Sequence, residues 1–163
     1  MTYIVENINI YIVPYIIKFM IKNTTSINKE AIIKVLEHVK LKTPKFDIMI
    51  KNGKNLAGRA YCKGSGYHST ARPFIVCRIP DNFPRFFKTY QIGQFKNKTY
   101  YFLDRIEALV YIMAHEIRHI WQSRHKNKRG YVYGSKGKFS EIDTEAYAIN
   151  RLRQWRKLED KYA

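Results

Sequence analysis

A chain of 163 residues, 45% of them hydrophobic, is long enough to bury one core, and we expect a single domain spanning residues 1–163. Its 30 Lys and Arg residues against 13 Asp and Glu residues give a formal net charge of +17, which favours association with polyanions such as nucleic acid. Two cysteines, Cys62 and Cys77, are too few for a disulfide framework or a cysteine-based zinc ribbon, so we interpret them as free thiols in a reducing, cytoplasmic setting.

An apolar segment near the N-terminus, residues 7–21 (NINIYIVPYIIKFMI), is interrupted by Pro14 and Lys18. The apolar run is too short to cross a bilayer and no basic region precedes it, so we expect neither a transmembrane span nor a signal peptide. Residues 8–12 alternate as in a strand, whereas the stretch after Pro14 is compatible with either a strand or a helix.

Residues 27–41 (INKEAIIKVLEHVKL) have the periodicity of an amphipathic helix, with Ser26 as the predicted N-cap. The predicted buried face consists of Ile32, Val35, Leu36 and Val39. His38 lies on the same helix and is interpreted as a surface residue.

Three short runs rich in β-branched and aromatic residues predict strands, at residues 45–50 (KFDIMI), 56–62 (LAGRAYC) and 74–79 (FIVCRI). Asn52-Gly53 between the first two runs is a hairpin signal, and residues 89–103 predict a further hairpin. The segment before the third run, residues 63–73, predicts a loop, so His68 is interpreted as a solvated histidine. These features favour a small, mostly antiparallel sheet.

From about Asp104 the pattern becomes helical, and the helix is apolar around most of its circumference, so it should be buried. It carries an H-E-x-x-H motif formed by His115, Glu116 and His119. Residues four apart lie on one face of a helix, so the two imidazoles can bind one metal ion. In zinc hydrolases two such histidines and a carboxylate hold the metal, and the adjacent glutamate takes a proton from water. A metal ion would also offset the cost of burying these polar side chains.

His125 is one candidate for the third ligand, because its distance from His119 fits the metzincin motif H-E-x-x-H-x-x-G-x-x-H. Two features argue against it. Gln122 stands where that motif has the glycine at which the helix breaks. No methionine follows Met113 to form the methionine turn of metzincins.

The C-terminal segment, residues 139–160, predicts a second helix with Ser140 as its N-cap. The apolar face of that helix consists of Ala148, Ile149, Leu152 and Trp155. Glu141 and Glu145 fall on this face, whereas Asp143 points away and is interpreted as a solvated residue. Carboxylates on an apolar face need a cation or strong donors, so both glutamates are candidate ligands, and pairing with nearby arginines is the alternative.

The sequence HEIRH, followed after 21 residues by EIDTEAYA, resembles the gluzincin metallopeptidases, in which a second helix supplies a ligating glutamate in an E-x-x-A/S-D/N pattern. ImmA/IrrE-like metallopeptidases and related small phage proteins are similar over residues 104–155. The resemblance implies that Glu141 is the third ligand and that Glu145 orients a ligating histidine. Thr144 and Glu145 depart from the small residue and the Asp or Asn of the pattern. If Glu145 itself bound the metal, Glu141 would not be the third ligand.

The expected fold is therefore α+β and zincin-like: a small, mostly antiparallel sheet, a buried active-site helix and a C-terminal helix that carries a ligand. The expected function is hydrolysis of peptide bonds with one zinc ion and Glu116 as general base. Tyr131 or Tyr133 would donate to the oxyanion, and FIVCRI as an edge strand would bind an extended peptide. Two alternatives stay open: a basic nucleic-acid-binding module with a structural zinc site, and a metal-dependent hydrolase of a non-peptide amide.

Overall fold

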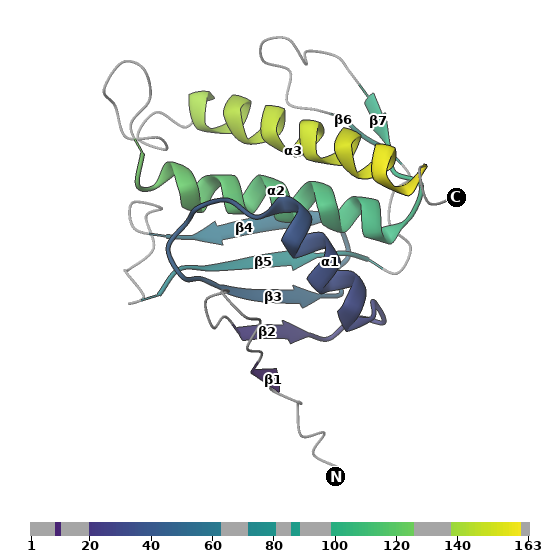
Figure 1. Cartoon of the computed structure of the whole chain (residues 1–163), viewed down its shortest axis with the longest axis horizontal. Coiled ribbons are helices and arrows are strands. Elements are labelled where there is room, and N and C mark those ends of the chain that lie inside the picture. The colour runs from purple at the N-terminus through teal and green to yellow at the C-terminus, as the bar shows by residue number, and fades with distance from the viewer. Residues whose placement is uncertain are drawn as a thin grey trace.

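A computed structural model describes residues 9–10, 20–62, 72–80, 86–88, 99–125 and 138–160. These residues form an α+β fold, as predicted, in which helices pack against a five-stranded sheet (Figure 1). Within the described ranges, no helix combines the length and the hydrophobicity that crossing a bilayer requires.

The five-stranded sheet has the order β1-β2-β3-β5-β4. Its strands are β1 (Asn9–Ile10), β2 (Met20–Asn23), β3 (Asp47–Lys51), β4 (Ala57–Tyr61) and β5 (Phe74–Arg78). A two-stranded antiparallel sheet joins β6 (Phe86–Lys88) to β7 (Thr99–Tyr101). The helices are α1 (Lys29–Val39), α2 (Arg105–Gln122) and α3 (Lys138–Glu159). The strand expected within residues 89–103 is therefore present as β7, and its partner β6 lies before that segment.

The prediction of a mostly antiparallel sheet is wrong, because two of the pairings, β2 with β3 and β3 with β5, are parallel. The pairings β1 with β2 and β4 with β5 are antiparallel. The cause is the segment that the sequence pattern left ambiguous. Met20–Asn23 is a strand, so α1 is a crossover between β2 and β3, and a crossover of this kind joins parallel strands.

The order of the last three strands corrects two further predictions. Asn52-Gly53 does not close a hairpin, because β5 lies between β3 and β4 and pairs with both. The run FIVCRI, which forms β5, is consequently an interior strand with no edge to offer a peptide. Among the described strands, β4 lies at this edge of the sheet instead.

Helix α1 begins at a different cap from the predicted one. The side chain of Asn28 accepts a hydrogen bond of 2.8 Å from the backbone N–H of Ala31, and Ser26 instead accepts from Arg105 at 2.8 Å. The predicted buried face of the helix is confirmed. His38 is half-buried rather than a surface residue, with Nε2 2.8 Å from a backbone carbonyl oxygen of α3.

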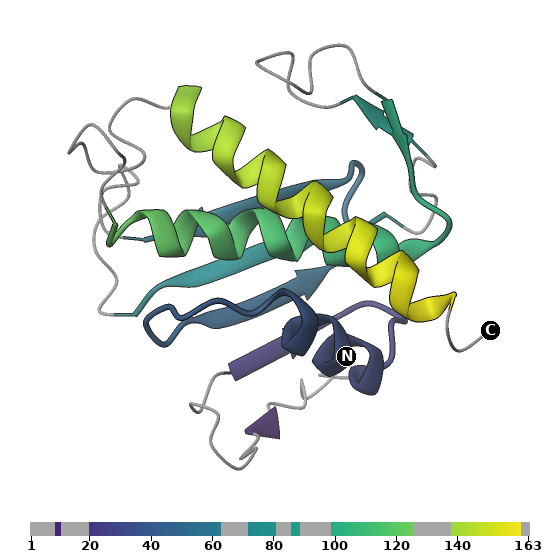
Figure 2. The same ribbon diagram turned by 45° about the horizontal axis from the view of Figure 1, so that its top comes forward.

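The main core joins the sheet to all three helices. Alternate residues of β3, Ile48 and Ile50, pack with apolar residues of α2, among which Met113 and Ile117 are fully buried. Helix α2 packs on β4 and β5, and α3 crosses over α2 on the other side (Figure 2). The predicted apolar face of α3 is also buried. Both cysteines are thiols that are not joined by a disulfide bond, as predicted. This packing brings the first turn of α3 beside the last turns of α2.

Candidate metal centre

Three side chains from α2 and α3 meet at one point. His115 and His119, one turn apart on α2, have their Nε2 atoms 3.2 Å from each other. Glu141, in the first turn of α3, places Oε2 3.2 Å from Nε2 of His115 and Oε1 3.3 Å from Nε2 of His119. The structure thus brings together the two histidines and the glutamate that the sequence predicted as ligands.

The size and chemistry of this cluster fit a zinc ion. Ligand atoms that lie 2.0–2.1 Å from a tetrahedral zinc ion are about 3.3 Å from one another. The two imidazole nitrogens are 3.2 Å apart, and the two oxygens of Glu141 lie 3.2 and 3.3 Å from one nitrogen each, so the nearest separations are close to this value. Imidazole nitrogen and carboxylate oxygen are both donors that zinc accepts. The cluster His115, His119 and Glu141 is therefore a candidate metal centre.

The start of α3 differs from the predicted one, although Glu141 is in place. The helix begins at Lys138, so Ser140 lies inside it and is not its N-cap. Thr144 is fully buried below Glu141, and its hydroxyl donates to the backbone carbonyl of Glu141 at 2.9 Å. A threonine thus fits at the position where the gluzincin pattern has a smaller residue.

Glu145 lies on the opposite side of the His115 ring from Glu141. Its Oε2 is 3.8 Å from Nδ1 of His115, and Tyr111 donates a short hydrogen bond to the same oxygen. The glutamate is almost fully buried. This position separates the two candidates for the third ligand: Glu141 faces the Nε2 side, and Glu145 faces the Nδ1 side. Tyr111 was not predicted, although its place four residues before His115 put it on the same helix face.

Glu116 is buried between α2 and the edge strand β4. A Cβ atom added to Gly58 of that strand would lie 2.3 Å from Oε1 of Glu116, so only a glycine leaves room for the carboxylate as it is placed. The backbone N–H of Ala60, on the same strand, donates to the carboxylate. Gly58 was not predicted as part of the site, although a glycine inside a strand often marks a close approach of another group.

The pKa values of the cluster reflect burial and shared hydrogen bonds. Burial raises the pKa of Glu116, and the neighbouring charges of His115 and His119 offset only part of this effect. Burial would also raise the pKa of Glu141, but hydrogen bonds from the same histidines hold it well below its usual range. Burial would lower the pKa of His119, yet Glu141 raises it above the ordinary value. A proton and a metal ion would therefore compete for His119.

Asp143 is not the solvated residue that was predicted. It accepts two hydrogen bonds from the guanidinium of Arg118, at 2.7 and 2.9 Å. It also accepts one of 2.8 Å from the side chain of Gln122. The helical projection placed Asp143 correctly away from the apolar stripe of α3, but the side chains that reach it come from α2.

His125 lies outside the cluster. Its ring stacks on Trp121 at a centroid distance of 3.9 Å, and its Nδ1 is 2.6 Å from the Trp121 carbonyl oxygen. This position agrees with the argument against a metzincin arrangement. The remaining sequence candidates, Tyr131, Tyr133 and His68, lie outside the described residues.

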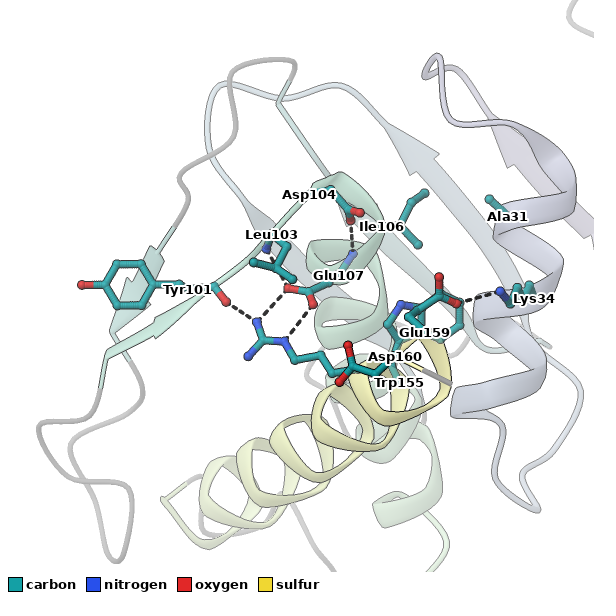
Figure 3. A pocket seen from close by; sticks show the side chains of 11 residues that line it. Ala31, Lys34, Tyr101, Leu103, Asp104, Ile106, Glu107, Trp155, Glu159 and Asp160 are labelled. Atoms are coloured by element: carbon teal, nitrogen blue, oxygen red, sulfur yellow. Dashed lines mark hydrogen bonds and ion pairs between the residues drawn. The ribbon is translucent and has the colours of Figure 1, made fainter. Parts of the chain in front are cut away.

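A pocket of about 550 Å³ lies at the opposite end of the α2/α3 pair (Figure 3). Four of its charged groups form two pairs: Arg156 donates to both oxygens of Glu107 at 2.7 Å, and Lys34 lies 2.7 Å from Glu159. The pocket is lined by residues of α1, the N-terminal turn of α2 and the C-terminal turns of α3. It is therefore separate from the candidate metal centre.

No protein-family model, curated protein or solved structure matches the chain. The resemblance of its two motifs to the gluzincin metallopeptidases consequently stays a prediction. The function is inferred from the chemistry of the cluster itself.

Proposed function

We propose that this protein is a zinc-dependent hydrolase of peptide bonds with a zincin-like fold. In this proposal His115, His119 and Glu141 hold one zinc ion, and Glu116 is the general base. The observation that carries the proposal is a cluster in which the two Nε2 atoms are 3.2 Å apart and each lies 3.2 or 3.3 Å from one oxygen of Glu141. It is made by the residues that an H-E-x-x-H motif and a second helix would supply.

A catalytic site is favoured over a structural one by the number of ligands. Structural zinc sites have four protein ligands, whereas three protein ligands leave one position for water or substrate. Within the described part of the chain, the cluster consists of three such residues. When bound, zinc would supply a Lewis acid that makes water more acidic and polarises a carbonyl group.

Glu116 has the properties that a general base at this site needs. It adjoins both histidines in sequence and space, yet its carboxylate is held by β4 rather than by the three ligands. Its pKa is raised by burial, and a base works best when its pKa approaches the operating pH. It would take the proton of the attacking water and later deliver it to the leaving amine.

The edge strand next to Glu116 supports a peptide as the substrate. An extended peptide can add to an exposed sheet edge through main-chain hydrogen bonds. β4 is the described strand at that edge, and its residues Gly58 and Ala60 contact the proposed base. The formal net charge of +17 further favours acidic proteins, or proteins bound to nucleic acid, as substrates to test first.

Metal analysis with a peptide-cleavage screen tests the proposal. Protein purified without chelator should contain about one zinc per chain, and His115→Ala should remove it. His125→Ala is the matched control, because it changes a histidine next to the same helix that lies outside the cluster. The wild-type protein should cleave members of a mixed peptide library, and chelation should abolish the cleavage. Zinc-free wild-type protein would refute the metal site. A zinc-loaded protein that cleaves only non-peptide amides, or that binds nucleic acid without cleaving anything, would refute the peptidase.

A further inference from the structure

A chain of hydrogen bonds links His119 to Arg118 through two other side chains. Nδ1 of His119 lies 3.0 Å from Oε1 of Gln122. Nε2 of Gln122 donates to Oδ2 of Asp143 at 2.8 Å. Asp143 in turn accepts from Nε and from a terminal nitrogen of Arg118, at 2.7 and 2.9 Å. This series of hydrogen bonds runs from His119 and Gln122 on α2 to Asp143 on α3, and from there back to Arg118 on α2.

The chemistry of these groups fixes which group donates and which accepts in each of these hydrogen bonds. A guanidinium only donates, and a carboxylate paired with it only accepts. Asp143 must therefore receive the NH₂ group of Gln122, so the carbonyl oxygen of that amide faces His119. An oxygen in this place requires a hydrogen on Nδ1 of His119. In a neutral imidazole with hydrogen on Nδ1, the lone pair is on Nε2, which is the atom that faces Glu141 and His115.

Burial of Gln122 and stacking of Arg118 prevent the donors and acceptors in this series of hydrogen bonds from exchanging roles. Gln122 is 1% exposed, so an amide turned the other way would oppose Asp143 with an oxygen and His119 with a donor, and water could not replace the lost bonds. Arg118 is fixed at the far end, because its guanidinium stacks over the ring of Trp121 at 3.8 Å and also lies over Tyr147 at 5.4 Å.

The two histidines of the cluster are held by different groups. His115 has the carboxylate of Glu145 on its Nδ1 side, whereas His119 has the neutral amide of Gln122. Gln122 also occupies the place at which a metzincin helix would break at a glycine. We propose that Arg118, Asp143 and Gln122 act together as positioning residues that fix His119 in the tautomer with Nε2 free for a metal ion. This inference rests on the proposed metal site.

Gln122→Met tests the inference, because methionine has nearly the length of glutamine but removes both its acceptor and its donor. We expect zinc affinity, measured by competition with a chelator, to fall by about 10- to 100-fold. In metal-free protein at a pH where His119 is neutral, ¹⁵N chemical shifts of the ring should show a smaller share of the Nδ1–H form than in the wild-type protein, in which the Gln122 oxygen competes with Glu141 for the ring hydrogen. Gln122→Glu keeps an acceptor next to Nδ1, and a proton shared between its second oxygen and Asp143 would replace the lost N–H, so it should restore the Nδ1–H tautomer and part of the zinc affinity.

Gln154→Met is the matched control, since Gln154 is an exposed glutamine of α3 whose partner, Arg151, lies outside the chain of hydrogen bonds. It should leave zinc affinity and tautomer unchanged. Thermal unfolding of each metal-free variant shows whether it is folded. If Gln122→Met is unfolded, the tautomer and the zinc affinity are measured on Gln122→Glu instead. Wild-type zinc affinity in Gln122→Met, or lost affinity with an unchanged tautomer, would overturn the positioning role alone. Wild-type protein that binds no zinc would overturn the metal site as well.

Discussion

Buried carboxylates have different interaction partners at the two ends of the α2/α3 pair. At the end shown in Figure 3, Glu107 is 3% exposed and accepts two hydrogen bonds of 2.7 Å from Arg156 and one of 2.7 Å from the backbone N–H of Leu103. At the other end, Glu141 meets two histidines, and Glu145 accepts a hydrogen bond from Tyr111. The same two helices thus hold acidic groups with a guanidinium at one end and with neutral or titratable rings at the other.

This difference shows at which end of the helix pair the protein itself balances the charge of the buried carboxylate. A guanidinium stays charged at every physiological pH, so the pair of Glu107 and Arg156 needs no further ion. Imidazole and phenol carry no positive charge unless the imidazole takes up a proton. Glu116, Glu141 and Glu145 all raise the pKa of Tyr111, after burial, so their negative charges act on one small region. A proton or a metal cation would reduce this negative charge, and the proposed zinc ion would supply two positive charges.

The largest expected effect is on the rate of hydrolysis at the histidine end. Glu116→Gln keeps the shape and polarity of the side chain but removes the base, so the cleavage rate should fall by about 10²- to 10⁴-fold. Zinc content should not change, because Glu116 is not a ligand in the proposal. Cleavage assays with zinc measured in both proteins give the comparison, and equal rates would contradict a catalytic Glu116.

Removing one carboxylate at each end should separate metal binding from stability. Glu141→Ala should lower zinc affinity more than the 10- to 100-fold expected for Glu145→Ala, because only Glu141 contributes a donor atom. Glu107→Ala should leave zinc affinity unchanged. It should lower the free energy of unfolding by about 1–3 kcal/mol, less than for a fully buried pair because the Arg156 side chain is 33% exposed.

Chelator competition and denaturant unfolding measure the two quantities. Equal zinc affinities in Glu141→Ala and Glu107→Ala would remove the distinction between the ends.

Gly58→Ala should disturb the base without disturbing the ligands. The added methyl group would lie 2.3 Å from Oε1 of Glu116, so the flexible end of that side chain must move. A displacement of about 1 Å at a reacting group costs about 10²-fold in rate. Zinc affinity should stay at the wild-type level, and Ala57→Gly on the same strand is the control for a change in strand propensity. Wild-type activity in Gly58→Ala would show that the position of Glu116 is not critical.

The dependence of stability on pH should have opposite signs with and without metal. In metal-free protein the pKa of His119 is raised above its unfolded value, so the protonated histidine stabilises the fold below the unfolded pKa. That contribution is lost as pH rises through the raised pKa of the folded state. Zinc requires an unprotonated histidine, so zinc-dependent stability should instead increase over the same range. Melting temperatures between pH 6 and pH 9, with EDTA and with zinc, test this expectation, and parallel curves would contradict it.

Helical periodicity made the local part of the site predictable. Spacing alone put His115 and His119 on one face of a buried helix and put Glu141 toward the core side of the next helix, because the geometry of a helix is fixed over a few turns. The gluzincin resemblance then distinguished Glu141 from Glu145. In the structure these two residues lie on different sides of the His115 ring.

The remaining features depend on contacts between distant segments. Parallel pairing of β2 with β3 follows from an extended segment at Met20–Asn23 whose sequence suits a helix equally well. The contact of Gly58 with Glu116 arises only when α2 packs on β4, and that of Asp143 with Arg118 only when α3 packs on α2. A projection of one helix shows the direction of a side chain but not the partner that it will meet.

The two ligand-bearing segments are separated by 21 residues, and this spacing gives the proposed metal ion a mechanical role. An ion bound to His119 and Glu141 would act as a removable crosslink, and closing a loop of about 20 residues restricts the unfolded chain by roughly 3 kcal/mol. The C-terminal half of α3 is anchored independently by Ile149, Leu152 and Trp155, which are buried in the core. Chelation should therefore loosen the first turn of α3 more than its last turns, so that amide hydrogens near Glu141 exchange with solvent before those near Leu152.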